Sequence, residues 1–190
     1  MKKITLIAAA VLVLAAGSFA QTWSVDKAHS NVGFSINHLS VSDITGNFKT
    51  FDAKITATQP DFSDAAFEFT ADVNSINTNN EQRDAHLKTP DFFDAAQYGT
   101  ISFKSTSVTK TGAKTFKVTG DLTFHGVTKS VTLVAVLNGT TVNPQSKKPL
   151  AGFKVTGTIK RTDFGIAAKF PAAMLGDDVA LVANGEFSKD

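Results

Sequence analysis

Apolar and polar residues alternate along two neighbouring runs of the chain, between positions 116 and 137. The first run places its large apolar side chains on one face: Phe116, Val118, Leu122 and Phe124. The second run repeats the pattern in phase: Val131, Leu133, Ala135 and Leu137. Between them, residues 125–129 are mostly polar and include Gly126, which suits a hairpin loop. A period of two predicts half-buried strands, so this stretch forms a hairpin with one apolar, partly aromatic face.

Similar runs recur along the chain and predict strands at 22–26, 31–38, 43–57, 65–76, 100–110, 114–124, 129–138, 152–161 and 179–187. Glycine-containing turn signals at 110–112 and 138–139 make the connections short. Short, evenly spaced strands are typical of an antiparallel barrel or sandwich. The sequence therefore predicts one all-β domain, whose inward face encloses either a packed core or a cavity.

One segment, 78–96, departs from the strand pattern and predicts a short helical insertion. Thr78 or Asn79 can cap its start, and Thr89 with Pro90 can begin a second short turn. Two interpretations stay open for this insertion. It is either a lid or plug at one end of a barrel, or a crossover that covers a sheet edge.

The first twenty residues predict a cleaved secretory signal peptide rather than part of the fold. Lys2 and Lys3 precede a short apolar stretch, and small residues at Ser18 and Ala20 suit cleavage after Ala20. No later segment approaches the ~20 consecutive apolar residues that a transmembrane helix needs. We expect residues 21–190 to form a single exported domain without a transmembrane segment.

Composition narrows the classes of partner. Without Lys2 and Lys3, the chain has 17 basic and 17 acidic residues, so a nucleic-acid partner is not expected. The chain has no cysteine, and an exported protein without disulfides depends on its core for stability. Its 16 phenylalanines, against one tryptophan and one tyrosine, predict an interior with few hydrogen-bonding groups.

The sequence contains no recognisable catalytic, phosphate-binding or cysteine-nucleophile motif, so we expect no catalytic residues and no cofactor. Its four histidines lack the tight spacing of a metal site, and no metal is expected: His29, His38, His86 and His125. Asp26 and His29 are close in sequence, as are Asp84 and His86. Structural hydrogen bonding is the favoured interpretation of both pairs over acid–base chemistry.

Arg161 is the most distinctive single residue, because alternation places it on the apolar face of Phe153, Val155 and Ile159. Burying an unpaired guanidinium is unfavourable. Arg161 either reaches solvent or Asp163 from the strand end, or binds a polar head group at a cavity mouth. His38 has the same two interpretations, and Arg83 either pairs with Asp84 or Glu81 or closes over a ligand.

The order of motifs resembles the YceI-like family of exported bacterial proteins. Besides Phe34 and His38, the matching motifs are WSVD (23–26), HS (29–30), GNF (46–48), SINT (75–78), RDAHL (83–87), DFFD (91–94), GDLTFHGVTK (120–129), RTDFG (161–165) and LGD (175–177). They span nearly all of the exported chain in the same order. Gly99 is a departure, since the family commonly has proline there, and it alters only a turn.

The resemblance implies an eight-stranded antiparallel lipocalin-like barrel in the periplasm, with an apolar tunnel for a long-chain isoprenoid or similar fatty-chain lipid. The apolar lining is then expected from the inward strand positions: Phe34, Ile36, Phe67, Phe69, Phe103, Phe116, Leu122, Phe124, Leu133, Phe153, Val155 and Ile159. The polar head group would meet Arg161, His38 and Arg83. A homodimer is left open.

Two other functions compete with a lipid carrier. One is an enzyme that acts on such a lipid, with His29, His38 or His125 as acid or base. The other is a small outer-membrane barrel, which would carry aromatic girdles rich in tyrosine and tryptophan. The chain has only one of each, so the carrier is favoured.

Overall fold

The structure, a computed structural model, describes residues 20–190. The predicted signal peptide therefore lies outside the described residues, apart from Ala20. The described strands are β1 (Gln21–His38), β2 (Ser42–Phe48), β3 (Phe51–Ala57), β4 (Ala66–Asp72), β5 (Ile76–Asn77), β6 (Thr100–Lys110), β7 (Thr115–Phe124), β8 (Val127–Val142), β9 (Pro149–Lys160) and β10 (Leu175–Lys189). One α-helix, α1 (Glu81–Leu87), and two short 3₁₀ helices, η1 (Val73–Ser75) and η2 (Arg161–Phe164), complete the described elements.

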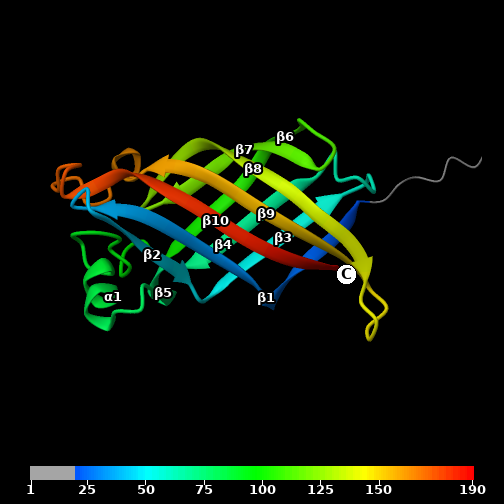
Figure 1. The fold of residues 1–190 in the computed structure, drawn as a ribbon, viewed down its shortest axis with the longest axis horizontal. Coiled ribbons are helices and arrows are strands. Elements are labelled where there is room, and N and C mark those ends of the chain that lie inside the picture. Colours follow the sequence, from blue (N-terminus) through cyan, green and yellow to red (C-terminus); the bar gives the residue numbers. More distant parts are fainter. Residues whose placement is uncertain (1–19) are drawn as a thin grey trace, which may run out of the picture.

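These strands form a closed antiparallel barrel (Figure 1). β2 and β3 run in line along β1, and β5 continues β4 after η1, so each pair acts as one interrupted strand. The barrel is therefore eight-stranded, and pairing of β10 with β1 closes it. The predicted all-β, eight-stranded antiparallel barrel with a short helical insertion is confirmed.

Strand boundaries differ from the predictions where local geometry decides them. The runs predicted at 22–26 and 31–38 belong to one strand, β1, which bulges between Asp26 and Asn31 opposite β10. His125 and Gly126 both have positive φ and make a two-residue turn, so β8 begins at Val127 rather than at 129. The helix begins later than expected, because the Asn80 side chain accepts a hydrogen bond from the Arg83 N–H.

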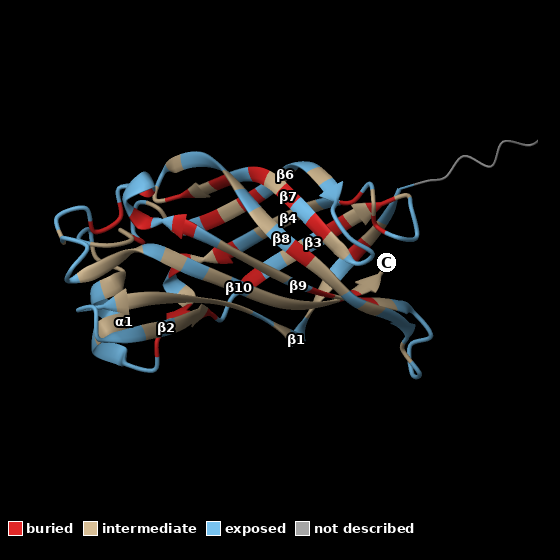
Figure 2. Cartoon of the chain, turned by 45° about the horizontal axis from the view of Figure 1, so that its top comes forward, coloured by how far each residue is buried: buried red, intermediate tan, exposed pale blue. Residues whose placement is uncertain are grey.

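One end of the barrel is filled by aromatic side chains, and we call it the closed end. Phe62, in the loop between β3 and β4, folds over this end and is buried against Trp23 and Phe153, each with ring centroids 5.2 Å away. Phe116 and Phe67 pack on Phe153 beside it. Buried residues recur along the inner faces of the strands (Figure 2). The closed end therefore has the dense apolar packing of an ordinary protein core.

The opposite end carries four connecting segments, and we call it the mouth end (at the left in Figure 1). They are the β1–β2 turn (39–41), the segment 78–98 that contains α1, the β7–β8 turn (125–126), and the loop 165–174 before β10. Among the described residues, no helix is long and apolar enough to span a membrane.

Candidate binding cavity

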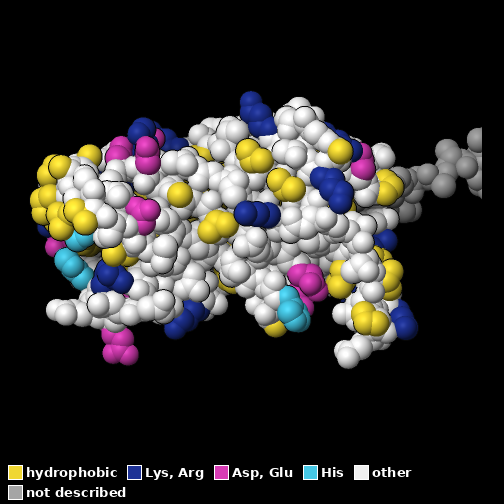
Figure 3. All heavy atoms as spheres, viewed as in Figure 1, with side chains coloured by type: hydrophobic (Ala, Val, Ile, Leu, Met, Phe, Trp, Pro, Cys, Tyr) yellow, Lys and Arg dark blue, Asp and Glu magenta, His cyan; other side chains and the backbone are white. Residues whose placement is uncertain are grey.

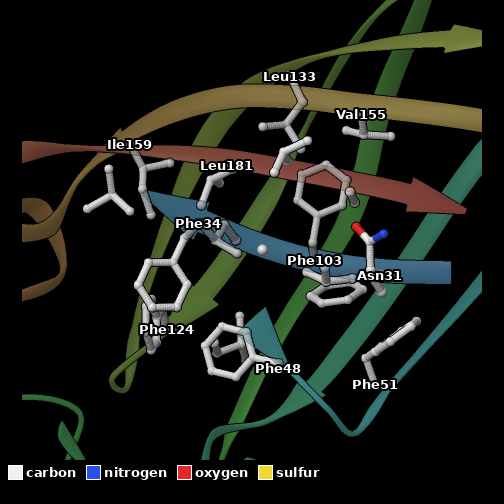
Figure 4. A pocket seen from close by; sticks show the side chains of 18 of the residues that line it. Asn31, Phe34, Phe48, Phe51, Phe103, Phe124, Leu133, Val155, Ile159 and Leu181 are labelled. Atoms are coloured by element: carbon white, nitrogen blue, oxygen red, sulfur yellow. The ribbon is translucent and has the colours of Figure 1, made fainter. Parts of the chain in front are cut away.

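Between the closed end and the mouth end, the barrel encloses a cavity of about 500 Å³. Every strand of the barrel wall except β5 contributes lining side chains. Figure 4 shows Phe34, Phe48, Phe103 and Phe124 arranged around it, with Leu181 from β10 beside Phe34. Binding sites for small apolar molecules have volumes in this range and a similar lining. The interior of the barrel is therefore a cavity over part of its length and a packed core over the rest.

The predicted apolar lining residues lie on this cavity, with one exception. Phe116 is the exception, because it lies beyond the cavity at the closed end and is 1% exposed. Its position on the inner face was predicted correctly. The sequence pattern could not show how far along the barrel the packing extends. Whether the lining residues contact a ligand stays a prediction.

Several lining residues were not among the predicted ones: Ile44, Phe48, Phe51, Phe92, Phe93 and Phe170. Phe48 and Phe51 flank the interruption between β2 and β3, where strict alternation ends. Phe92 and Phe93 belong to the 78–98 segment, which folds over the barrel so that Phe93 packs on Phe124 with centroids 5.2 Å apart. The phenylalanine pair inside a mostly polar insertion was the available signal for this contact.

Glycine allows one ring to lie flat against the cavity wall. A Cβ atom at Gly46 on β2 would lie 2.5 Å from Cζ of Phe34, which is closer than side-chain atoms approach one another. The Phe34 ring therefore covers the backbone of β2. Gly46 fixes the orientation of an aromatic side chain that lines the cavity.

The 78–98 segment and the 165–174 loop meet across the mouth through a cluster that we call the clasp. The rings of Phe92 and Phe170 stack with centroids 5.4 Å apart and planes 21° apart. Beside them, the Lys169 ammonium donates to the Asp91 carboxylate, and this hydrogen bond holds the pKa of Asp91 below its usual range. His86 packs edge-on against Phe92. The clasp thus joins the predicted helical insertion, for which a lid was one of two interpretations, to the opposite side of the mouth.

Replacing Phe92 with alanine should loosen the mouth without unfolding the barrel. Aromatic pairs contribute about 0.5–1.5 kcal/mol beyond the area they bury, so amide exchange in residues 165–174 should rise by a few-fold to about tenfold. Hydrogen-exchange mass spectrometry measures this change. Gln97→Ala, at an exposed position of the same segment, should leave the exchange of this loop unaltered. Unchanged exchange in Phe92→Ala would show that the clasp does not restrain the mouth.

Arg161 follows β9 as the first residue of η2, and its guanidinium is buried with 3% exposure. The interpretation that it reaches solvent is therefore wrong, and its contact with a polar head group stays a prediction. Its hydrogen bonds go to backbone carbonyl groups instead. Nε donates to Gly176, Nη1 to Ile166 and Ala167, and Nη2 to Phe170 and Leu175, over 2.7–3.1 Å. Five donors on five acceptors use the whole hydrogen-bonding capacity of the side chain. Arg161 borders the cavity, yet its donors hold the mouth loop in place.

Arg83 and His38 border the mouth end of the cavity. Arg83 donates from Nε to Oγ1 of Thr78 at 2.8 Å and from Nη2 to the Thr78 carbonyl at 2.7 Å. Within the described part of the chain, no acceptor takes its remaining N–H groups, in contrast to Arg161. His38 ends β1 and is exposed. These two side chains keep polar groups available where the cavity opens.

The histidines do not converge. His29 lies on the β1 bulge and His125 in the β7–β8 turn, where its Nδ1 is 3.0 Å from the Phe164 carbonyl oxygen. Of the three proposed acid–base histidines, only His38 borders the cavity. In the described chain, the one group of three side chains close enough to share a metal ion is Asp26, His29 and Glu186 on the outer bulge. The expected structural hydrogen bond between Asp26 and His29 is present at 2.9 Å.

The Asp26–His29 pair should give a measurable pH dependence. The hydrogen bond that the His29 ring donates to the Asp26 carboxylate raises the pKa of His29 above its ordinary 6.5 and lowers the pKa of Asp26 below 3.8. Stabilisation by the charged pair is therefore present below pH 6.5, and is lost as pH rises through the raised pKa of His29. At the acid side, it is lost as pH falls through the lowered pKa of Asp26.

In Asp26→Asn, the pKa of His29 should fall back toward 6.5, as measured by NMR titration of the imidazole protons. Asp52→Asn, which removes the partner of Lys27 on the same bulge, is the matched control and should leave the His29 titration in place. If the pKa of His29 were the same in wild type and Asp26→Asn, the Asp26 carboxylate would not be the cause of the raised pKa.

The fold and the cavity together define a closed antiparallel barrel that encloses an apolar cavity. Within this class, the chain belongs to the YceI-like domain family, which it matches over residues 23–187. It is 41% identical over 170 residues to the UPF0312 protein SA2479 of Staphylococcus aureus, covering 87% of this chain and 96% of that protein. The family predicted from the motifs is confirmed.

Solved structures agree with this assignment. The YCEI protein of Campylobacter jejuni is 34% identical, with a TM-score of 0.74, and the match covers 100% of this chain and 99% of that one. A polyisoprenoid-binding domain from Saccharophagus degradans has the same fold at 16% identity, with a TM-score of 0.64 over 88% of this chain and 98% of that one. At 16% identity, the similarity to the Saccharophagus degradans domain shows a shared fold and nothing more.

Proposed function

We propose that this protein is a periplasmic carrier or storage protein that holds a long-chain isoprenoid, or a similar amphiphilic lipid, in its barrel. The observation that carries the proposal is the apolar cavity of about 500 Å³, closed at one end by aromatic side chains. Each methylene moved from water into such a cavity contributes roughly 0.8 kcal/mol. A few isoprene units therefore supply enough free energy for stable binding.

The two ends of the cavity suit the two parts of an amphiphile. The hydrocarbon chain would point toward Phe153 and Phe67 at the closed end, and the head group would stay at the mouth. Arg83 and His38 have polar groups available there, whereas Arg161 has given its donors to the mouth loop. We therefore assign head-group contact to Arg83 and His38 and a structural role to Arg161.

Support for an isoprenoid comes from the Saccharophagus degradans domain with the same fold, which is described as polyisoprenoid-binding. Support for the periplasm comes from the basic, apolar and small-residue pattern of the first twenty residues. Enzymatic activity has weaker support, because only one of the three histidines considered for it borders the cavity.

Extraction of the purified protein followed by mass spectrometry tests the proposal. We expect a bound lipid with a narrow range of chain lengths, because the aromatic side chains at the closed end limit the depth of the cavity. A protein free of lipid, or one with randomly distributed chain lengths, would count against it. Steady conversion of the lipid that His38→Ala abolishes would show that the protein is an enzyme rather than a carrier.

A further inference from the structure

The mouth end carries an exposed apolar surface, which we call the rim and define as residues 39–41 and 170–175. Its sequences are Leu-Ser-Val and Phe-Pro-Ala-Ala-Met-Leu, with no charged residue. Leu39 is 51% exposed, Val41 85% and Met174 47%. Figure 3 shows hydrophobic side chains gathered at this end of the molecule, at the left of the view. Exposed loops are usually polar, so an uncharged apolar rim points to an interaction surface.

The two parts of the rim form one surface. The N–H of Leu39 donates to the Met174 carbonyl at 2.9 Å, which ties the β1–β2 turn to the loop before β10. Leu39 and Ser40 both have positive φ, an uncommon conformation for these residues. The fold accepts this backbone cost in a turn that leaves Leu39 and Val41 in solvent.

The rim is continuous with the cavity. Phe170, Met174 and Leu175 belong to the rim and also line the cavity, and His38 lines it next to Leu39. A hydrocarbon chain that enters between the turn and the loop would therefore remain in contact with apolar groups. If the rim faced water, the chain would have to cross an aqueous layer before it reached the cavity.

We propose that the rim inserts into the surface of a lipid bilayer, so that a lipid passes between the bilayer and the cavity without exposure to water. This inference rests on the proposed lipid-binding function. A second copy of the chain fits the surface less well, since stable protein interfaces use about 20–30 residues on each side and the rim has nine, in 39–41 and 170–175. A shallow apolar surface of this size suits the boundary between head groups and acyl chains.

Because the rim has no charged residue, its binding to a bilayer should depend little on lipid charge or salt concentration. Lys169, the cation next to the rim, is already paired with Asp91. Docking should therefore depend on apolar insertion rather than on anionic lipid. It should occur on phosphatidylcholine vesicles and persist when the salt concentration is raised, which screens charge interactions.

Vesicle flotation of the full chain tests the proposal. The wild-type protein should float with phosphatidylcholine vesicles, and Val41→Asp should weaken partitioning about tenfold or more, because it places a charge in the inserting surface. Val142→Asp is the matched control. It makes the same substitution at a valine that is 55% exposed and ends β8, away from the mouth, and it should float like wild type.

Failure of wild type to float, or equal flotation of wild type and Val41→Asp, would overturn the inference. A dimer in light scattering that Val41→Asp dissociates, without any vesicle binding, would assign the rim to a second copy instead. Binding of a polyisoprenoid added from ethanol without vesicles tests the cavity separately. Val41→Asp should bind it like wild type, and failure of both to bind it would refute the carrier function while leaving the flotation result intact.

Discussion

Replacing Arg161 with methionine should lower the free energy of unfolding by about 3–5 kcal/mol. The substitution keeps much of the side-chain volume but removes five N–H donors from the carbonyl groups of residues 166, 167, 170, 175 and 176. Buried carbonyl groups without donors lose the hydrogen bonds that they make with water in the unfolded chain. The loop at the mouth should therefore open, and the melting temperature should fall by about 10 °C.

Urea denaturation of the purified variant measures this loss. Lys160→Met removes the same charge from the neighbouring residue, whose ammonium is exposed and pairs with Asp178, so its midpoint should move far less. Arg161→Lys should fall between wild type and Arg161→Met, because an ammonium has three donors rather than five. An Arg161→Met protein as stable as wild type would mean that water replaces the lost donors.

Leu181→Trp should weaken binding of a long-chain isoprenoid at least about tenfold. Leu181 lines the cavity from β10 beside Phe34, and a larger ring there occupies space that the hydrocarbon chain needs. Excluding two methylene groups from the cavity already removes about 1.6 kcal/mol, which is more than a factor of ten. The barrel should still fold, since the added ring fills an existing cavity rather than a packed core.

Titration calorimetry with a defined polyprenol measures this effect. Ala180→Trp adds a tryptophan at the preceding residue of the same strand, which is exposed on the outer face, and binding should remain at the wild-type level. Loss of affinity in both variants would indicate general damage to β10. Wild-type affinity in Leu181→Trp would show that the ligand binds elsewhere on the protein.

The barrel was predictable because the signal for a strand is local. Each residue on an inward face is two positions from the next, so alternation assigned Phe34, Phe103 and Phe124 to the interior without knowledge of their partners. The extent of the cavity was not predictable in this way. It depends on Phe62, which lies in a connecting loop at positive φ and shows no strand periodicity, yet fills the closed end.

Arg161 shows that the partners of a buried side chain are also not predictable from the sequence pattern. Alternation correctly indicated that its side chain lies on the apolar side of the barrel. The acceptors that compensate its charge are backbone carbonyl groups of the loop that follows η2. Because every residue has a carbonyl group, no residue type in the sequence marks such a partner. Solvent, the Asp163 carboxylate and a polar head group were therefore the only partners of Arg161 that the sequence suggested.

The pairing of β1 with β10 has a consequence for how the protein acquires its structure. Trp23 pairs with Lys189, and the N–H of Asp190 donates to the Thr22 carbonyl, so the final contacts join the two ends of the described chain. The barrel cannot close until its last strand has been synthesised. Contacts between residues so distant in sequence favour slow folding. The proximity of the ends of the described residues makes this barrel a suitable scaffold for circular permutation, with new termini in the exposed β8–β9 connection.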